Sequence, residues 1–198
     1  KCEDGNDWKN QISSVVRITV DNSSRYATGT LVNTTSNKSS AYIITSANTL
    51  IGNPDNWVFD FNYLSEKCDN YSRSKQAISV SGAEVVAISE TSNLALIKLK
   101  NIPEHAWNVY HSGWDRSEEI PDDVICVHHS HGALKKISRD YEQLELLEIM
   151  DRAIFAVDSW EVGSTLSGSI GSPLFNDKGL LVGVFSGGDI SCDDIDDS

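Results

Sequence analysis

Apolar residues in this chain gather in short runs that are rich in valine and isoleucine and often alternate with polar residues. Turn-forming residues separate the runs at short intervals. Alternation with a period of two is typical of β-strands that bury one face. The pattern predicts strands over residues 13–20, 27–33, 41–45, 57–61, 83–89, 94–99, 123–129, 144–149, 153–158, 172–176 and 180–186.

Helical periodicity is rare, and the one short helix that we expect lies around DWKNQI, residues 7–12. The last two predicted strands are separated by Asn176-Asp177-Lys178-Gly179, which predicts a hairpin in which Gly179 supplies a positive φ. The pattern as a whole predicts an all-β fold, as a barrel or a pair of barrels.

A proline-bearing connection, KNIPEHAWNVY at 100–110, separates the earlier strands from the later ones. We therefore expect a first β-barrel in residues 1–105 and a second in residues 106–198. No low-complexity linker divides the chain, and at 198 residues it is long enough for a substantial core. The two barrels are expected to pack as one unit.

The charge of the chain bears on its partners. It carries 29 acidic and 16 basic residues, a net charge of -13. Nucleic acids and anionic membrane surfaces attract basic faces, so this balance argues against both as partners. No stretch of about 18 apolar residues is present, so no membrane insertion is expected.

Cysteines and glycosylation sequons indicate the compartment. The four cysteines allow three pairings, and no Cys-x-x-Cys spacing suggests zinc. Asn-x-Ser/Thr sequons favour a secreted, extracellular protein and leave actual glycosylation open. A chain that does not begin with methionine is typical of a mature or trimmed product. The sequons begin at Asn22, Asn33, Asn37 and Asn70.

Four stretches together carry a resemblance to a known family. They are TGTLVNTTSNKSSAYIITSAN (28–48), SNLALIKL (92–99), HSGWDRSEEIPDDVICVHHSHGALKKIS (111–138) and GSIGSPLFNDKGLLVGVFSGG (168–188). In this order the chain resembles the lysyl endopeptidase branch of the chymotrypsin-like serine proteases, over about residues 2–192. The resemblance implies a chymotrypsin/trypsin-like double β-barrel.

Carried over to this sequence, the catalytic positions of the family are occupied by Asn48, Asn93 and Ile170. An amide does not take up a proton near neutral pH, so Asn48 cannot act as a general base. Ile170 has no group to ionise as a nucleophile. The resemblance therefore implies a catalytically dead protease homologue, a pseudoprotease, and not an enzyme.

Other parts of the family's site are retained. The loop at Gly168, Ser169 and Ile170 is expected to keep main-chain N–H groups aimed at an oxyanion position. Trp160, Ser186, Gly187 and Gly188 correspond to the wall of the substrate pocket and predict a binding cleft. One family tryptophan is kept at Trp160, whereas Ser186 replaces a histidine.

The resemblance also implies a disulfide between Cys2 and Cys68. Cys192 matches a family cysteine whose partner lies upstream of Lys1, so the chain is trimmed, or Cys192 is free or pairs with Cys126. The family continues beyond Cys192 with a further strand and a helix. Either the second barrel is truncated at its C-terminus or the chain is incomplete.

From these features we expect a regulatory or decoy protein that binds a protein or peptide ligand. The alternative is a structural or assembly subunit that makes its contacts through the barrel surface. A third hypothesis is a hydrolase with a relocated nucleophile, Ser167 or Ser169 with Ser172 nearby, and a base that the sequence does not identify.

Metal and cofactor chemistry is not expected. His128 and His131 of HHSH could share a metal only with further ligands that no spacing identifies, and the family has His-His here without metal catalysis. The terminal DDIDD lacks the glycine and glutamate of a calcium loop. SGSIG resembles the nucleophile elbow of α/β-hydrolases, but that elbow needs a later histidine, and all five histidines precede it.

Overall fold

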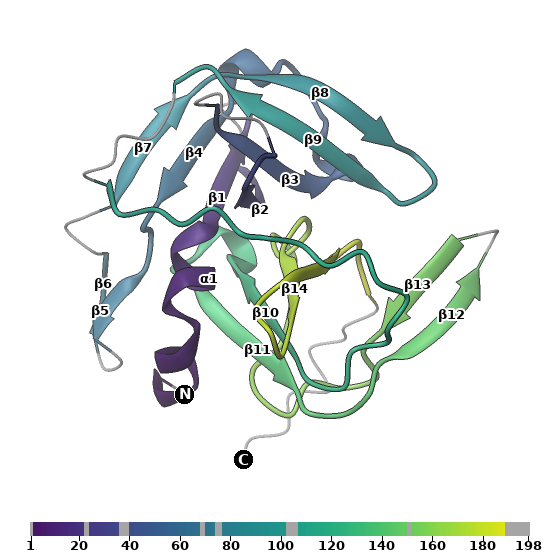
Figure 1. The fold of residues 1–198 in the computed structure, drawn as a ribbon. Coiled ribbons are helices and arrows are strands. Elements are labelled where there is room, and N and C mark those ends of the chain that lie inside the picture. The colour runs from purple at the N-terminus through teal and green to yellow at the C-terminus, as the bar shows by residue number, and fades with distance from the viewer. Residues whose placement is uncertain are drawn as a thin grey trace.

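The computed structural model describes residues 2–21, 24–35, 40–67, 70–73, 77–101, 107–149 and 152–188. A seven-stranded antiparallel sheet occupies the first half, in the order β7-β4-β1-β2-β3-β9-β8 (Figure 1). Its strands are β1 (Val15–Val20), β2 (Arg25–Val32), β3 (Tyr42–Ser46), β4 (Val58–Phe61), β7 (Ile78–Ser81), β8 (Ala83–Ser89) and β9 (Leu94–Leu99). A small separate pair consists of β5 (Ser65–Lys67) and β6 (Asn70–Arg73).

A glycine corner curls this sheet into a half-barrel. Gly82 alone separates β7 from β8, at opposite ends of the sheet, and its φ is +84°. Its N–H donates to Trp57 O and its carbonyl accepts from Lys100 N, both at 3.0 Å. The chain thus passes directly from one end of the sheet to the other. The inward residues form one core that includes Ile18, Phe59 and Ile97.

The second half contains a four-stranded sheet in the order β11-β10-β14-β15, and a two-stranded ribbon. The sheet consists of β10 (Val124–His128), β11 (Lys136–Asp140), β14 (Pro173–Asn176) and β15 (Leu181–Val184), and the ribbon of β12 (Glu145–Ile149) and β13 (Arg152–Ala156). The predicted hairpin is confirmed, because Gly179 has a φ of +70° and its N–H donates to Asn176 O at 2.8 Å. This all-β architecture confirms the predicted fold class.

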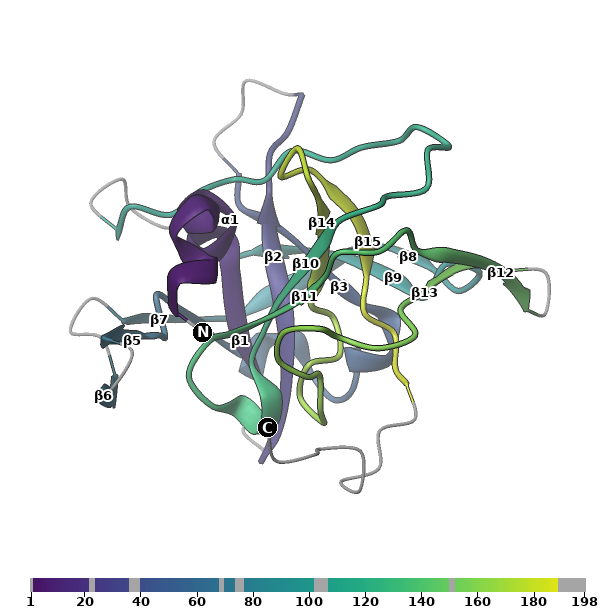
Figure 2. The same cartoon turned by 90° about the horizontal axis from the view of Figure 1, so that it is seen from below.

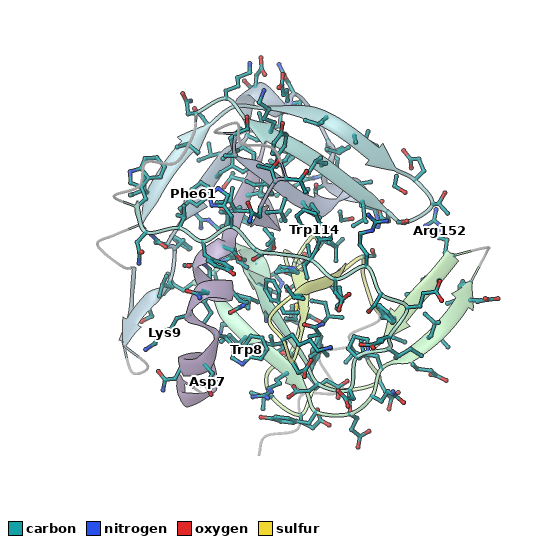
Figure 3. The ribbon with its side chains drawn as sticks, in the orientation of Figure 1. Asp7, Trp8, Lys9, Phe61, Trp114 and Arg152 are labelled. Carbon is teal, nitrogen blue, oxygen red and sulfur yellow. The ribbon has the colours of Figure 1, made fainter. Side chains whose placement is uncertain are left out.

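The N-terminal segment packs on the second sheet. It forms a 3-10 helix η1 (Cys2–Trp8) and an α-helix α1 (Lys9–Ser14), where the sequence predicts a helix. Trp8 joins a second core cluster with Ile125 and Phe175. Figure 3 shows Trp8 beside this part and Phe61 within the first sheet. Lys135 Nζ donates to Ile12 O at 2.6 Å and to Val15 O at 2.7 Å, which satisfies carbonyls at the end of the helix.

Arg17 forms a partly buried ion pair within the first sheet and also reaches the second half of the molecule. Arg17 of β1 donates through Nε and Nη2 to Asp60 Oδ2, at 2.9 and 2.8 Å. Its Nη1 donates to Gly132 O at 2.7 Å, in the 3-10 turn η5 (Ser130–Gly132) that follows β10. The guanidinium also lies 3.8 Å from the Tyr63 ring centroid. One side chain therefore ties the first sheet to the second.

Every strand that the sequence predicts is present, with ends that differ by at most a few residues. The structure adds β5, β6, β7 and β11, which the pattern does not predict. The predicted domain boundary at residue 105 lies outside the described residues. No described helix is long and apolar enough to cross a membrane.

Most residues of the cysteine and sequon predictions lie outside the described part of the chain. These are Cys68, Cys192, Asn22 and Asn37, together with the side chains of Cys2 and Asn70. The Cys2–Cys68 disulfide and glycosylation therefore stay predictions. Asn33 is exposed just after β2. Cys126 is a buried free thiol, and burial raises its pKa to about 12.

Candidate functional site

The three positions that match the family's catalytic residues gather at the junction of the two sheets. β3 leads into the 3-10 turn η2 (Ala47–Thr49), which carries Asn48. Asn93, in the turn before β9, accepts from Asn48 N through Oδ1 at 3.2 Å. From the second half, Ile170 O accepts from Thr28 N of β2 at 2.8 Å. The end of the first sheet and the loop before β14 thus meet at these positions.

The loop before β14, residues 166–172, consists of two consecutive turns. Ser169 N donates to Leu166 O at 2.9 Å, and Ser172 N donates to Ser169 O at 3.0 Å. Positive φ values of +91° at Gly168 and +84° at Gly171 allow these turns, and glycine is the residue that adopts such values with least strain. We call residues 166–172 the turn loop.

The turn loop leaves two main-chain donors unused. Within the described part of the chain, the N–H groups of Gly168 and Ile170 donate no hydrogen bond. They flank Ser169, whose own N–H is occupied within the turn. Paired free N–H groups on a glycine-rich turn can hold a carbonyl oxygen or an anion. The predicted oxyanion-binding loop therefore has suitable donors, and binding to them stays a prediction.

A buried histidine lies behind the turn loop, at the end of β10. His128 Nδ1 is 3.0 Å from Ser169 Oγ and 2.9 Å from Ser130 Oγ, and Nε2 is 3.1 Å from Ser138 Oγ. Ser130 Oγ and Ser169 Oγ are 2.9 Å apart. His128 is only 1 % exposed and Ser169 is fully buried. Burial, reinforced by Lys136, lowers the pKa of His128 to about 4.

The neighbouring His129 has a structural environment of its own. Its Nδ1 lies 2.9 Å from the carbonyl of Ala133 and must donate, because a carbonyl only accepts. Its buried Nε2 has no partner among the described residues. Burial and the charge of Lys135 hold the pKa of His129 well below its ordinary value. The described residues contain no cluster of three metal-binding side chains, at HHSH or elsewhere.

The predicted pocket wall lies partly beside the turn loop. Gly171 N donates to Phe185 O at 2.9 Å and Phe185 N donates to Ser172 O at 2.8 Å, so the segment after β15 runs along the loop. Ser186, Gly187 and Gly188 follow and are exposed. Trp160 is half-buried, and its Nε1 donates to Thr165 Oγ1 at 3.2 Å.

Solved structures share this arrangement of two β-units and define it as a trypsin-like serine protease fold. Deg5 is 16% identical, with 94% of this chain and 86% of that chain covered and a TM-score of 0.63. Rv3671c from M. tuberculosis H37Rv, as a serine-to-alanine mutant in an inactive form, is 16% identical, with 92% and 78% covered and a TM-score of 0.58. The MamO protease domain from Magnetospirillum magneticum is 16% identical, with 89% and 85% covered and a TM-score of 0.56.

The family is established by sequence. Residues 1–198 match the family model of the lysyl endopeptidase C-terminal domain, and the chain belongs to this family. The resemblance inferred from the four motifs is thereby confirmed at the level of the family.

The prediction that the chain is not an enzyme is contradicted. It rested on Asn48, Asn93 and Ile170 at the family's catalytic positions, and the structure places another serine hydroxyl, Ser169 Oγ, within hydrogen-bond distance of His128 Nδ1. Structures with the same fold include the Rv3671c protease and the MamO protease domain. Replacement of the family residues at Asn48, Asn93 and Ile170 is therefore no ground for calling the chain a pseudoprotease.

From sequence alone, Ser169 is a possible nucleophile without an identified base, and His128 is expected only as a structural or metal-binding residue. The missing signal was the pairing of β10 with β14. Cys126 lies opposite Leu174 in that pair, and extending the antiparallel register brings His128 opposite Ser172, close to Ser169. Strand pairing over such a separation is not visible in a local pattern.

Acid is expected to destabilise the fold through His128. Its pKa of about 4 in the folded protein lies below the ordinary 6.5, so the unfolded chain binds the proton more strongly. Stability is then complete above pH 6.5 and falls as the pH drops towards 4, by about 3 kcal/mol from this residue. Urea unfolding at pH 7.5 and 4.5 measures the loss.

The matched variants are His128→Asn and His131→Asn, the second at an exposed histidine in the turn η5 that follows β10. His128→Asn should show a smaller loss of stability between the two pH values, whereas His131→Asn should behave like the unsubstituted protein. An unchanged loss in His128→Asn would show that His128 does not carry the acid sensitivity.

Proposed function

We propose that this chain binds an extended protein or peptide segment across the turn loop, with one peptide carbonyl held by the N–H groups of Gly168 and Ile170. The observation that carries the proposal is this pair of donors, which have no acceptor within the described residues. The turn loop is closed by two turns and hydrogen-bonded to both sheets, so its donors are held in fixed positions. Little conformational entropy is therefore lost when a ligand binds.

The segment after β15 supplies the second wall of the proposed site. Phe185 is hydrogen-bonded to the turn loop through its N–H and through its carbonyl. The exposed Ser186, Gly187 and Gly188 follow, and the two glycines have no side chain that would cover a ligand backbone. An extended peptide that pairs with such a segment gains main-chain hydrogen bonds independent of its sequence. A regulatory or decoy role and secretion belong to the same proposal.

Gly188 provides the sharpest test of this site. A Cβ at Gly188 would lie 3.9 Å from the Phe185 ring, an ordinary contact, and Gly188 has no positive φ. Gly188→Trp should therefore fold but fill the site, and weaken binding of lysine- or arginine-centred heptapeptide amides at least tenfold. Gly188→Ala is the control and should bind as the unsubstituted protein does. Equal binding by all three proteins in calorimetric titration would exclude this site.

A second candidate function is hydrolysis by Ser169 with His128 as its base, and the 3.0 Å contact between them favours it. His128 Nδ1 would take the hydroxyl proton while Ser169 Oγ attacks the carbonyl carbon of the substrate, and would give that proton to the leaving amine as the peptide C–N bond breaks. Water would then release the acyl group from Ser169. Because both side chains are buried, the turn loop must open for this step. Ser167 is exposed, and Ser172 Oγ donates to Ser169 O, so neither replaces Ser169 in this contact.

The same titrations separate the two candidates when the peptides are recovered and a fluorophosphonate is added. Hydrolysis predicts cut peptides and one phosphonyl adduct on Ser169, with fluoride released, and both are lost in Ser169→Ala but kept in Ser167→Ala. Binding without cut peptides and without an adduct leaves the first proposal standing and removes the second.

A further inference from the structure

Strand β8 lies at the open end of the seven-stranded sheet. Within the described residues it pairs with β9 alone, and Figure 1 shows it at the margin of the molecule. Seen from below in Figure 2, the β8–β9 ribbon again extends to the side of the molecule, as the β12–β13 ribbon does. The outer edge of β8 therefore offers main-chain groups for a further strand.

The side chains of β8 are apolar and exposed on both faces. After the buried Ala83, every residue from Glu84 to Ile88 is exposed. Val85 is 40%, Val86 48% and Ile88 49% exposed, so about half of the surface of each residue is open to a partner. The adjacent β9, by contrast, alternates between buried and half-buried positions. β-Branched side chains in a row on a free edge pack well against an added strand.

Edge strands are usually protected against such pairing by lysine, proline or a bulge. β8 contains neither lysine nor proline. Its one protection is an irregularity in the pairing with β9, between Val85 and Ala87. Regular pairing resumes from Ala87 to Ser89, so the strand that we expect here is short.

Charge restricts what can dock. Residues 83–94 carry the carboxylates of Glu84 and Glu90 and no basic side chain. Lys98 of β9 pairs with Glu84 at 3.1 Å, which leaves Glu90 as the acidic end of the ribbon. The whole chain has a net charge of -13, so a second copy would be repelled and a basic segment attracted.

We propose that β8 is a docking edge for a short extended segment of a partner protein in which β-branched and basic residues alternate. The added strand pairs with the outer edge of β8 and its apolar side chains cover Val86 and Ile88. Its basic side chains lie on the opposite face and are attracted by the net negative charge of the chain. This surface belongs to the first sheet and does not include the turn loop. The proposal for β8 can therefore be true or false independently of the proposed function.

The experiment titrates ¹⁵N-labelled protein with an acetylated heptapeptide amide of alternating valine and lysine, and follows the main-chain amide signals by NMR. A second peptide replaces each lysine with glutamate, and a third replaces the central valine with proline, which cannot pair as a strand. The variant Val86→Thr/Ile88→Thr keeps β-branched residues, so the strand should form, but it removes apolar surface. Gly188→Trp is titrated in the same way, because it shows whether the peptide binds at the turn loop instead.

The proposal expects shifts at residues 84–90 that persist in Gly188→Trp, in which the turn-loop site is filled. At these residues, binding should be at least tenfold weaker in the double variant and with both control peptides. Shifts in the turn loop instead, equal binding of the proline peptide, or no shift at millimolar peptide would overturn it. Sedimentation of the protein without peptide completes the test. If the protein associates with itself and the double variant does not, the edge binds a second copy of the chain, and the proposed partner is overturned.

Discussion

Substituting alanine for Gly171 is expected to destabilise the protein by about 3–5 kcal/mol, a large part of the stability of an ordinary domain. A Cβ at this position would lie 2.1 Å from Thr45 Oγ1 and 2.2 Å from Thr28 O, and the second contact is with main chain that cannot rotate away. The φ of +84° adds strain for any residue with a Cβ. Thermal and urea unfolding measure the loss.

Gly183→Ala is the matched control for this prediction. Gly183 lies in β15, has no positive φ, and its Cβ would meet nothing closer than 4.0 Å. The control should therefore change stability by less than about 1 kcal/mol. A stable Gly171→Ala protein would mean that the turn loop can move away from the first sheet, which would also weaken the proposed binding site.

Breaking the ion pair between Arg17 and the buried Asp60 is the second large effect. Arg17→Met should cost about 3–5 kcal/mol, because it leaves the Asp60 carboxylate, 5% exposed, without its cation. It also removes the bond from Arg17 to Gly132 O that joins the two halves of the molecule. Unfolding in urea at neutral pH measures the change.

A double-mutant cycle shows whether the charge is the cause. Arg17→Met combined with Asp60→Asn should be at least about 1 kcal/mol more stable than Arg17→Met alone, because the buried charge is gone. Lys98→Met breaks the exposed pair with Glu84 and should cost less than about 1 kcal/mol. Costs that simply add in the cycle would show that Arg17 acts through packing and not through its charge.

Prediction from sequence worked where a strand buries one face. In β1, the buried Val16, Ile18 and Val20 alternate with the half-buried Arg17 and Thr19. The alternation of apolar and polar residues in the sequence predicts this arrangement directly. It failed at β11, where the buried positions are Ser138 and Asp140. Ser138 is hydrogen-bonded to His128 Nε2 from the neighbouring strand, and Asp140 accepts from the N–H of Glu142, two residues further along. A pattern that counts polar residues as exposed does not show that these two are buried.

The candidate site shows the same division. Motif order was enough to locate Asn48, Asn93 and the turn loop, and the structure brings them to one junction. It was not enough to find the contact between Ser169 and His128, which are 41 positions apart. That contact removes the reason for predicting an inactive protein.

The sequence by itself determined the all-β class, most of the strands, the hairpin at Gly179 and the family, because these follow from local periodicity, turn chemistry and ordered motifs. Only the tertiary structure decided which polar groups meet and which apolar groups stay uncovered. β8 illustrates the second case, since its pattern predicts a half-buried strand and its place at the end of the sheet exposes Val86 and Ile88. A period of two shows that a strand forms, but its neighbours are chosen by packing across the whole chain.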